Sequence, residues 1–169
     1  MILISCVMNV YPQKIIKDET RNNVRSVMTD DKNFSIRKGS VKYMLCQFST
    51  LEKKEYALVF SYEETEKPNN FPYQSKLFIT TKSGKNIVLT CLDSYINFNY
   101  PVGMFPISQN DFNLIIEGTK LLEFDLYVMD KYGQIIRTTR KYKKDIGKSL
   151  YKMKKKIDNY TTSQVYGIK

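Results

Sequence analysis

The chain of 169 residues contains no histidine and no tryptophan. Without histidine, Ser-His-Asp and Cys-His catalysis and histidine-ligated metal sites are excluded. Its seven glycines are scattered, and none of the glycine-rich motifs that cradle phosphates occurs. Glu123 and Asp125 fall on one face of a predicted strand, but no third ligand accompanies them. We therefore predict no catalytic residue, no cofactor-binding residue and no metal site, and we expect no cofactor and no enzymatic activity.

Long hydrophobic runs are also missing. No stretch approaches the ~20 consecutive apolar residues that a membrane-spanning helix needs. Hydrophobic residues nevertheless make up 42% of the chain, which is enough for a folded core. The length suits one domain over residues 1–169.

Cysteine is scarce, and Cys6, Cys46 and Cys91 lie too far apart for a zinc-ligand spacing. Two interpretations remain open. In one, all three are reduced, buried thiols, and Ile2 to Val10 is a buried strand of a cytoplasmic protein. In the other, Leu3-Ile4-Ser5-Cys6 is a lipobox, Cys6 is lipidated at the cell envelope, and Cys46 and Cys91 form a disulfide. The second interpretation requires a charged, apolar leader upstream of Met1.

The positive charge is concentrated near the C-terminus. Residues 137–158 hold ten basic and two acidic residues, a net charge of +8, whereas the remaining residues contribute only +2 of the total of +10. Such a local field attracts phosphates, anionic lipid headgroups or acidic proteins. The sequence leaves the partner unknown, either a protein or an anionic polymer or surface.

Alternation of apolar and polar residues predicts a β-rich protein. It is clearest in residues 41–48 and 56–62 and in two hairpins, over 77–92 and 122–139. Residues 12–33 are polar and predict a loop or weakly ordered segment, and residues 95–103 predict irregular structure. We expect an α+β fold with an antiparallel sheet or sandwich of about seven strands.

Two helices are predicted. Ser108 and Asp111 form the start of a short helix near 109–117, which Gly118 ends. Ile146, Leu150, Met153 and Ile157 recur at helical spacing and predict an amphipathic helix near 145–158. Its lysines form an outward ridge, which is either an anion-binding surface or the solvated face of an ordinary helix. The ridge comprises Lys148, Lys152, Lys154, Lys155 and Lys156.

Two segments carry a family resemblance. Phe105-Pro106-Ile107-Ser108-Gln109-Asn110-Asp111 and Lys144-Asp145-Ile146-Gly147-Lys148, within residues 105–157, resemble a pattern in small, uncharacterised β-rich bacterial lipoproteins and secreted proteins. That group carries no known activity, so the resemblance implies only a location at the cell surface.

These observations predict a non-enzymatic binding or structural module, placed at the bacterial cell surface if Cys6 is lipidated. The alternative function is a nucleic-acid or anionic-surface binder that uses the basic C-terminal helix.

Overall fold

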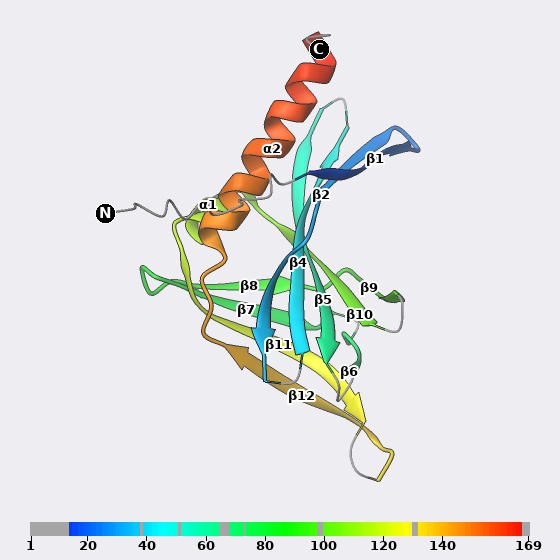
Figure 1. Cartoon of the computed structure of the whole chain (residues 1–169), viewed down its shortest axis with the longest axis vertical. Coiled ribbons are helices and arrows are strands. Elements are labelled where there is room, and N and C mark those ends of the chain that lie inside the picture. Colours follow the sequence, from blue (N-terminus) through cyan, green and yellow to red (C-terminus); the bar gives the residue numbers. More distant parts are fainter. Residues whose placement is uncertain are drawn as a thin grey trace, which may run out of the picture.

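The computed structural model describes residues 14–37, 39–50, 52–64, 68–72, 74–97, 100–129 and 132–166. Within these residues, twelve strands form two antiparallel sheets, of seven and five strands, and two helices complete the fold (Figure 1). The β-rich α+β class is therefore confirmed, with more strands than the sequence predicts. Neither helix in the described part of the chain is long and apolar enough to cross a membrane.

The larger sheet, sheet A, has the strand order β1-β2-β4-β5-β10-β9, and β3 also pairs with β4. Strands β4 and β5 pair along their whole length, from Gly39 opposite Glu64 to Ser49 opposite Lys54. The strands are β1 (Ile15–Arg21), β2 (Val24–Thr29), β3 (Lys32–Ile36), β4 (Gly39–Ser49), β5 (Lys54–Glu64), β9 (Asp93–Asn97) and β10 (Tyr100–Ile107).

The smaller sheet, sheet B, has the order β12-β11-β7-β8, and β6 also pairs with β11. In Figure 1 its strands run across those of β4 and β5 rather than along them. Both predicted hairpins lie in this sheet, with Gly84 and Gly133 at positive φ in their turns. The strands are β6 (Pro68–Asn70), β7 (Lys76–Thr81), β8 (Asn86–Thr90), β11 (Thr119–Met129) and β12 (Ile135–Tyr142).

Two segments predicted to lack regular structure are strands, so those predictions are wrong. Residues 15–29, inside the predicted loop 12–33, form the hairpin β1–β2. Asn22 and Asn23 close it with φ values of +49° and +62°, a conformation that asparagine tolerates. Residues 95–103 lie largely within β9 and β10. Charged side chains on the edge strand β1 and Pro101 in β10 hide the alternation that strand prediction relies on.

The core lies between the inner faces of the two sheets and is rich in aromatic rings. The face of β5 that the alternation predicts to be apolar is buried, including Phe60 and Tyr62. The ring centroid of Phe124 on β11 lies 4.9 Å from that of Phe60 and 5.5 Å from that of Tyr62. These contacts between sheets explain why the aromatic alternation on β5 marks core rather than a binding face.

Both predicted helices form. Helix α1 (Gln109–Ile116) begins at Ser108, whose Oγ accepts the Asp111 N–H at 3.1 Å and donates to Asp111 Oδ2 at 2.8 Å. Gly118 follows it with φ +134°. Helix α2 (Gly147–Tyr166) extends beyond the predicted residues 145–158. In Figure 1 it rises alongside β4 and the hairpin β1–β2.

The predicted disulfide is wrong, because Cys46 and Cys91 are both free. Cys46 packs with Val59 and Val102 on the outer face of sheet A, whereas Cys91 belongs to the main core between the sheets. Burial raises the pKa of the Cys46 thiol to about 11 and also raises that of Cys91. Cys6 lies outside the described residues, so its lipidation stays a prediction.

Candidate functional site

Helix α2 presents two opposite faces. The apolar stripe predicted from its spacing is confirmed, since Ile146, Leu150, Met153 and Ile157 are all at most 1% exposed. At about 100° per residue, Lys148 and Lys155 project from the side opposite this stripe, Lys152 lies beside them, and Lys156 lies on the flank, about 90° from the stripe. All four side chains are exposed, and none forms an ion pair with a described residue. Burial of the stripe therefore orients these lysines toward solvent.

Lys154 does not belong to this exposed ridge, which corrects the sequence-based prediction. Its Nζ lies 2.6 Å from Asp158 Oδ2 and 5.6 Å from the ring centroid of Tyr56. Partial burial acts to lower the pKa of Lys154, but its contacts with Asp158 and Tyr56 outweigh that effect and raise it. The Tyr56 hydroxyl also donates to Asp158 Oδ1 at 3.1 Å. Lys154 thus helps to attach α2 to sheet A.

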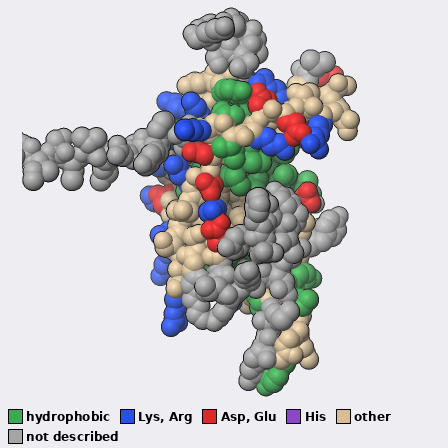
Figure 2. Space-filling model, turned by 45° about the vertical axis from the view of Figure 1, so that its right-hand side comes forward, with side chains coloured by type: hydrophobic (Ala, Val, Ile, Leu, Met, Phe, Trp, Pro, Cys, Tyr) green, Lys and Arg blue, Asp and Glu red, His purple; other side chains and the backbone are tan. Residues whose placement is uncertain are grey.

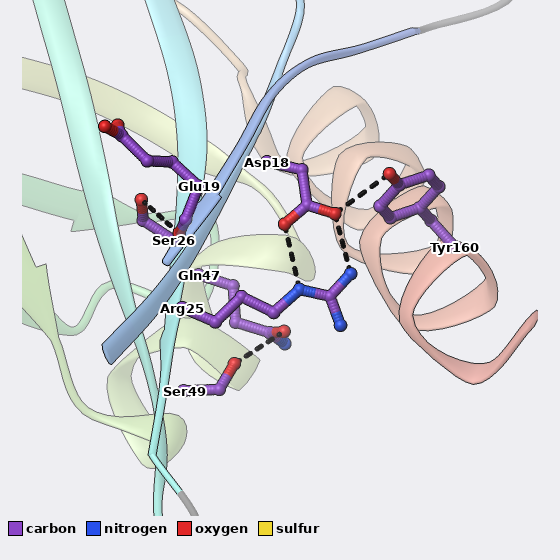
Figure 3. A network of polar contacts seen from close by, with 7 residues as sticks. All are labelled: Asp18, Glu19, Arg25, Ser26, Gln47, Ser49 and Tyr160. Carbon is purple, nitrogen blue, oxygen red and sulfur yellow. Dashed lines mark hydrogen bonds and ion pairs between the residues drawn. The ribbon is translucent and has the colours of Figure 1, made fainter. Parts of the chain in front are cut away.

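A second polar network holds the described C-terminal part of α2 to the hairpin β1–β2 (Figure 3). Asp18 accepts two hydrogen bonds from the Arg25 guanidinium, at 2.9 and 2.7 Å, and a third from the Tyr160 hydroxyl at 2.9 Å. The hydrogen bond from Arg25 is the main reason that the pKa of Asp18 is lowered. Residues far apart in sequence thereby fix the direction of the helix.

The first turn of α2 is held by Asp145 and Thr119. Asp145 Oδ1 accepts the backbone N–H groups of Thr119 at 3.1 Å and Gly147 at 3.0 Å, while Oδ2 pairs with Lys82. The Thr119 hydroxyl donates to the Lys144 carbonyl at 2.6 Å and accepts the Ile146 N–H at 2.9 Å. Partial burial acts to raise the pKa of Asp145, but the hydrogen bonds from Lys82 and the two N–H groups lower it.

Gly147 allows the start of α2 to approach the end of α1 closely. A Cβ atom at this position would lie 2.6 Å from the Ile115 carbonyl oxygen and 2.8 Å from the Gly118 Cα. Both neighbours are backbone atoms that cannot turn away. Only glycine therefore permits this junction, and the Asp-Ile-Gly-Lys segment is explained by packing.

Beside this junction is an open pocket of about 300 Å³ lined by four lysines. Lys82 reaches it from the β7–β8 turn, Lys120 from β11, and Lys143 and Lys144 from the segment before α2. Lys144 Nζ lies 5.7 Å from the ring centroid of Phe34. We call these four lysines together with Lys148, Lys152, Lys155 and Lys156 the lysine surface.

Ion pairing elsewhere leaves the lysine surface strongly positive. Many carboxylates of the described residues pair with cations outside it, as Glu63 does with Lys42 and Glu123 does with Lys141, both at 2.6 Å. Asp145 is the acidic residue among those that line the lysine pocket. Figure 2 shows Lys and Arg side chains along the left edge of the view and a further group at its upper right. The basic C-terminal segment therefore produces a local positive field, because neighbouring carboxylates do not neutralise its charge.

The remaining candidate groups, the carboxylates of β11 and a metal-binding cluster, are respectively ion-paired and absent in the described part of the chain. Glu123 pairs with Lys141, and Asp125 pairs with Arg137 at 2.5 Å and accepts the Thr139 hydroxyl at 3.2 Å. No group of three or more Asp, Glu or Cys side chains among the described residues could hold a metal ion. The carboxylates of β11 therefore form cross-strand ion pairs with β12.

Sequence reasoning found the ridge on α2 but missed the pocket at its base. Lys82 and Lys120 lie on separate strands and turns, and nothing in their local sequence distinguishes them from other surface lysines. Lys143 and Lys144 fall in the basic segment but precede the helix. Only the pairing of β7 with β11 and the return of the chain along β12 bring the four together.

No family model, curated protein or solved structure matches the chain.

Proposed function

We propose that this protein is a non-enzymatic binding module that holds the phosphate backbone of a nucleic acid on the lysine surface. One observation carries the proposal: four exposed lysines lie within an arc of about 100° on a helix whose apolar stripe is fully buried, and none pairs with a described carboxylate. The helix is also fixed at its start by Asp145 and farther along by Tyr160. The helix that carries these lysines is thus held in place before a ligand arrives.

The arrangement of the lysines favours a linear polyanion. With a rise of 1.5 Å per residue, Lys148, Lys152 and Lys156 follow one another at intervals of about 6 Å along the helix axis. The pocket lysines add further positive charge near the start of α2. Lysine binds phosphate as a point charge, without the planar bidentate geometry of arginine. The contact would therefore be insensitive to base sequence and strongly dependent on salt.

Insertion into a membrane is less compatible with the same geometry. Helices that lie in a membrane interface bury their apolar face among the lipids, whereas the apolar stripe of α2 is buried against the protein. Among the described side chains of α2, Tyr151 is the exposed large hydrophobic one, at 44%. An anionic bilayer could then be bound only through charge. Binding to such a bilayer is the alternative that the experiment below distinguishes from binding to DNA.

Fluorescence anisotropy with a labelled DNA oligonucleotide tests this function. The ridge variant Lys148→Gln/Lys152→Gln/Lys156→Gln is expected to bind at least tenfold more weakly than the wild type at low salt. A plot of the logarithm of the binding constant against the logarithm of the salt concentration has a negative slope. Its magnitude should decrease by about 0.7–0.9 for each phosphate contact removed. Thermal unfolding followed by circular dichroism checks that both proteins are folded.

The matched control is Lys14→Gln/Lys54→Gln/Lys76→Gln, which removes the same charge from exposed lysines outside the lysine surface. This control should retain most of the binding. Equal weakening in the two variants would show that net charge alone attracts DNA, and absence of binding at low salt would overturn the proposal. Retention on phosphatidylglycerol vesicles without DNA binding, lost in the ridge variant, would replace the nucleic acid with a membrane surface.

A further inference from the structure

Strand β8 differs from the other edge strands of the two sheets. Its residues, Asn86-Ile87-Val88-Leu89-Thr90, include no charge. Every other described edge strand of at least five residues carries one or more charged residues, namely β1, β3, β9 and β12. Charged residues on an edge strand discourage pairing with another chain. Strand β8 lacks this protection.

The free edge of β8 offers backbone groups for pairing. The Thr81 N–H donates to the Lys85 carbonyl, and the Cys91 N–H donates to that of Ser75. In an antiparallel ladder, Ile87 and Leu89 then exchange hydrogen bonds with β7. Asn86, Val88 and Thr90 consequently direct their N–H and C=O groups away from β7. Among the described residues, these groups have no hydrogen-bond partner.

Apolar side chains are exposed at the same edge. Val88 is 49% exposed, and its neighbour Phe78 on β7 is 37% exposed. On this outer face of sheet B, Val88 and Phe78 continue a row that ends with Glu123 and Lys141. The row is therefore polar and ion-paired at the β12 side, but apolar where it reaches the open edge.

We propose that β8 is the interface for a second copy of this chain, which pairs antiparallel to it about a two-fold axis at Val88. Val88 then faces Val88 of the second copy, and Asn86 faces Thr90, so that every free N–H and C=O group of these residues gains a partner. Phe78 and Val88 of both copies form one continuous apolar row across the joined sheet. The strand thus complements itself without any foreign sequence.

The charge distribution favours the antiparallel orientation. Lys82 and Lys85 lie in the turn at one end of β8, and each molecule carries a net charge of +10. Antiparallel pairing separates the two turns by the length of the strand, about 17 Å at 3.3–3.4 Å per residue. Parallel pairing would place them side by side and would oppose like charges.

Sedimentation equilibrium of the full chain, under reducing conditions and over a wide concentration range, tests the interface. The wild type is expected to show a monomer–dimer equilibrium. Val88→Lys, which opposes two like charges at the axis, should weaken it by about tenfold or more. Val88→Pro should also weaken dimerisation. It should not unfold the hairpin, because the Val88 N–H points away from β7.

Ile135→Lys is the matched control, since Ile135 is 62% exposed on β12 at the opposite edge of sheet B. This variant should dimerise like the wild type. A wild type that stays monomeric at every concentration, a dimer unaffected by Val88→Pro, or equal loss in Ile135→Lys would each overturn the proposal. A monomer that instead captures an extended peptide at β8 would also overturn it.

Oxidative cross-linking tests the register independently. Paired residues in this position have Cα atoms about 5.5 Å apart, which suits a disulfide. Val88→Cys should therefore give a covalent dimer on a non-reducing gel, in excess of that formed by Ile135→Cys, which carries the same native cysteines. No excess, in a protein that sediments as a dimer, would contradict the two-fold axis at Val88.

Discussion

The buried and the lysine-bearing faces of α2 have different physical roles. On one face, Leu150, Met153 and Ile157 are completely buried, and the helix packs on sheet A and α1. On the other, Lys148, Lys152 and Lys155 are exposed and make no ion pair with a described residue. Burial of apolar side chains stabilises the helix position, whereas exposed lysines contribute little to stability. The second face can therefore be altered without cost to the fold, which makes its function testable by mutation.

Lys154 lies between these two faces and shows how narrow the boundary is. It is only 25% exposed and pairs with Asp158, one turn farther along the helix. The neighbouring Lys155 is exposed. Membership of the lysine surface thus depends on the direction of each side chain rather than on its place in the charge run.

The largest expected effect is on the buried face. Leu150→Ala should lower the free energy of unfolding by about 2–5 kcal/mol, because it removes a buried side chain and leaves a cavity between α2 and the core. Chemical denaturation monitored by circular dichroism measures the loss. At temperatures where the variant is folded, its affinity for DNA should match that of the wild type. A loss below about 1 kcal/mol would indicate that α2 is not docked in solution.

A smaller effect is expected at the helix start, and it depends on pH. Because folding lowers the pKa of Asp145, the resulting stability is complete above the ordinary value of 3.8 and is lost as pH falls through the folded pKa. Asp145→Asn should cost about 1 kcal/mol or less near neutral pH, since solvent screens a side chain that is 37% exposed. The difference from the wild type should vanish at strongly acidic pH.

Denaturation of both proteins across the acidic range checks this expectation. Lys82→Met supplies the control, since it removes the partner of the same ion pair. The double variant should then lose less than the sum of the two single losses. A difference between Asp145→Asn and the wild type that stayed constant with pH would show that the charge of Asp145 does not stabilise the helix start.

The smallest effect distinguishes two lysines of the same helix. Lys154→Ala should reduce stability by about 0.5–1 kcal/mol, because it breaks the pair with Asp158 and uncovers Tyr56. Lys152→Ala should change stability by less than about 0.5 kcal/mol but should weaken DNA binding more than Lys154→Ala does. Denaturation and fluorescence anisotropy of both variants measure these effects. If Lys152→Ala lost more stability and Lys154→Ala lost more DNA affinity, the assignment of the two faces would be contradicted.

Local signals predict the helices and the central strands well. Ser108, Asp111 and Gly118 mark the ends of α1 because capping chemistry acts within a few residues. The spacing of Ile146, Leu150, Met153 and Ile157 predicts the buried stripe of α2 because one face of a helix follows directly from its period. The alternation in β4 and β5 is equally clear because both strands pair on each side and pack on the core.

Edge strands and long-range pairs could not be predicted in the same way. The hairpin β1–β2 carries charges on both faces because one edge of sheet A is solvated, so its pattern resembles that of a loop. The free state of Cys46 and Cys91 depends on which face of which sheet each one occupies. Lys82 and Lys120 join the lysine surface only through sheet pairing.

Composition, local spacing and charge thus specify a β-rich protein without histidine chemistry and with an amphipathic, lysine-rich C-terminal helix. These properties can be predicted from the sequence because they depend on composition or on residues only a few positions apart. The tertiary structure decides which lysines are free, how Asp145 and Thr119 secure the helix start, and which strand edge stays open. Each of these depends on contacts between residues far apart in sequence, for which local periodicity carries no signal.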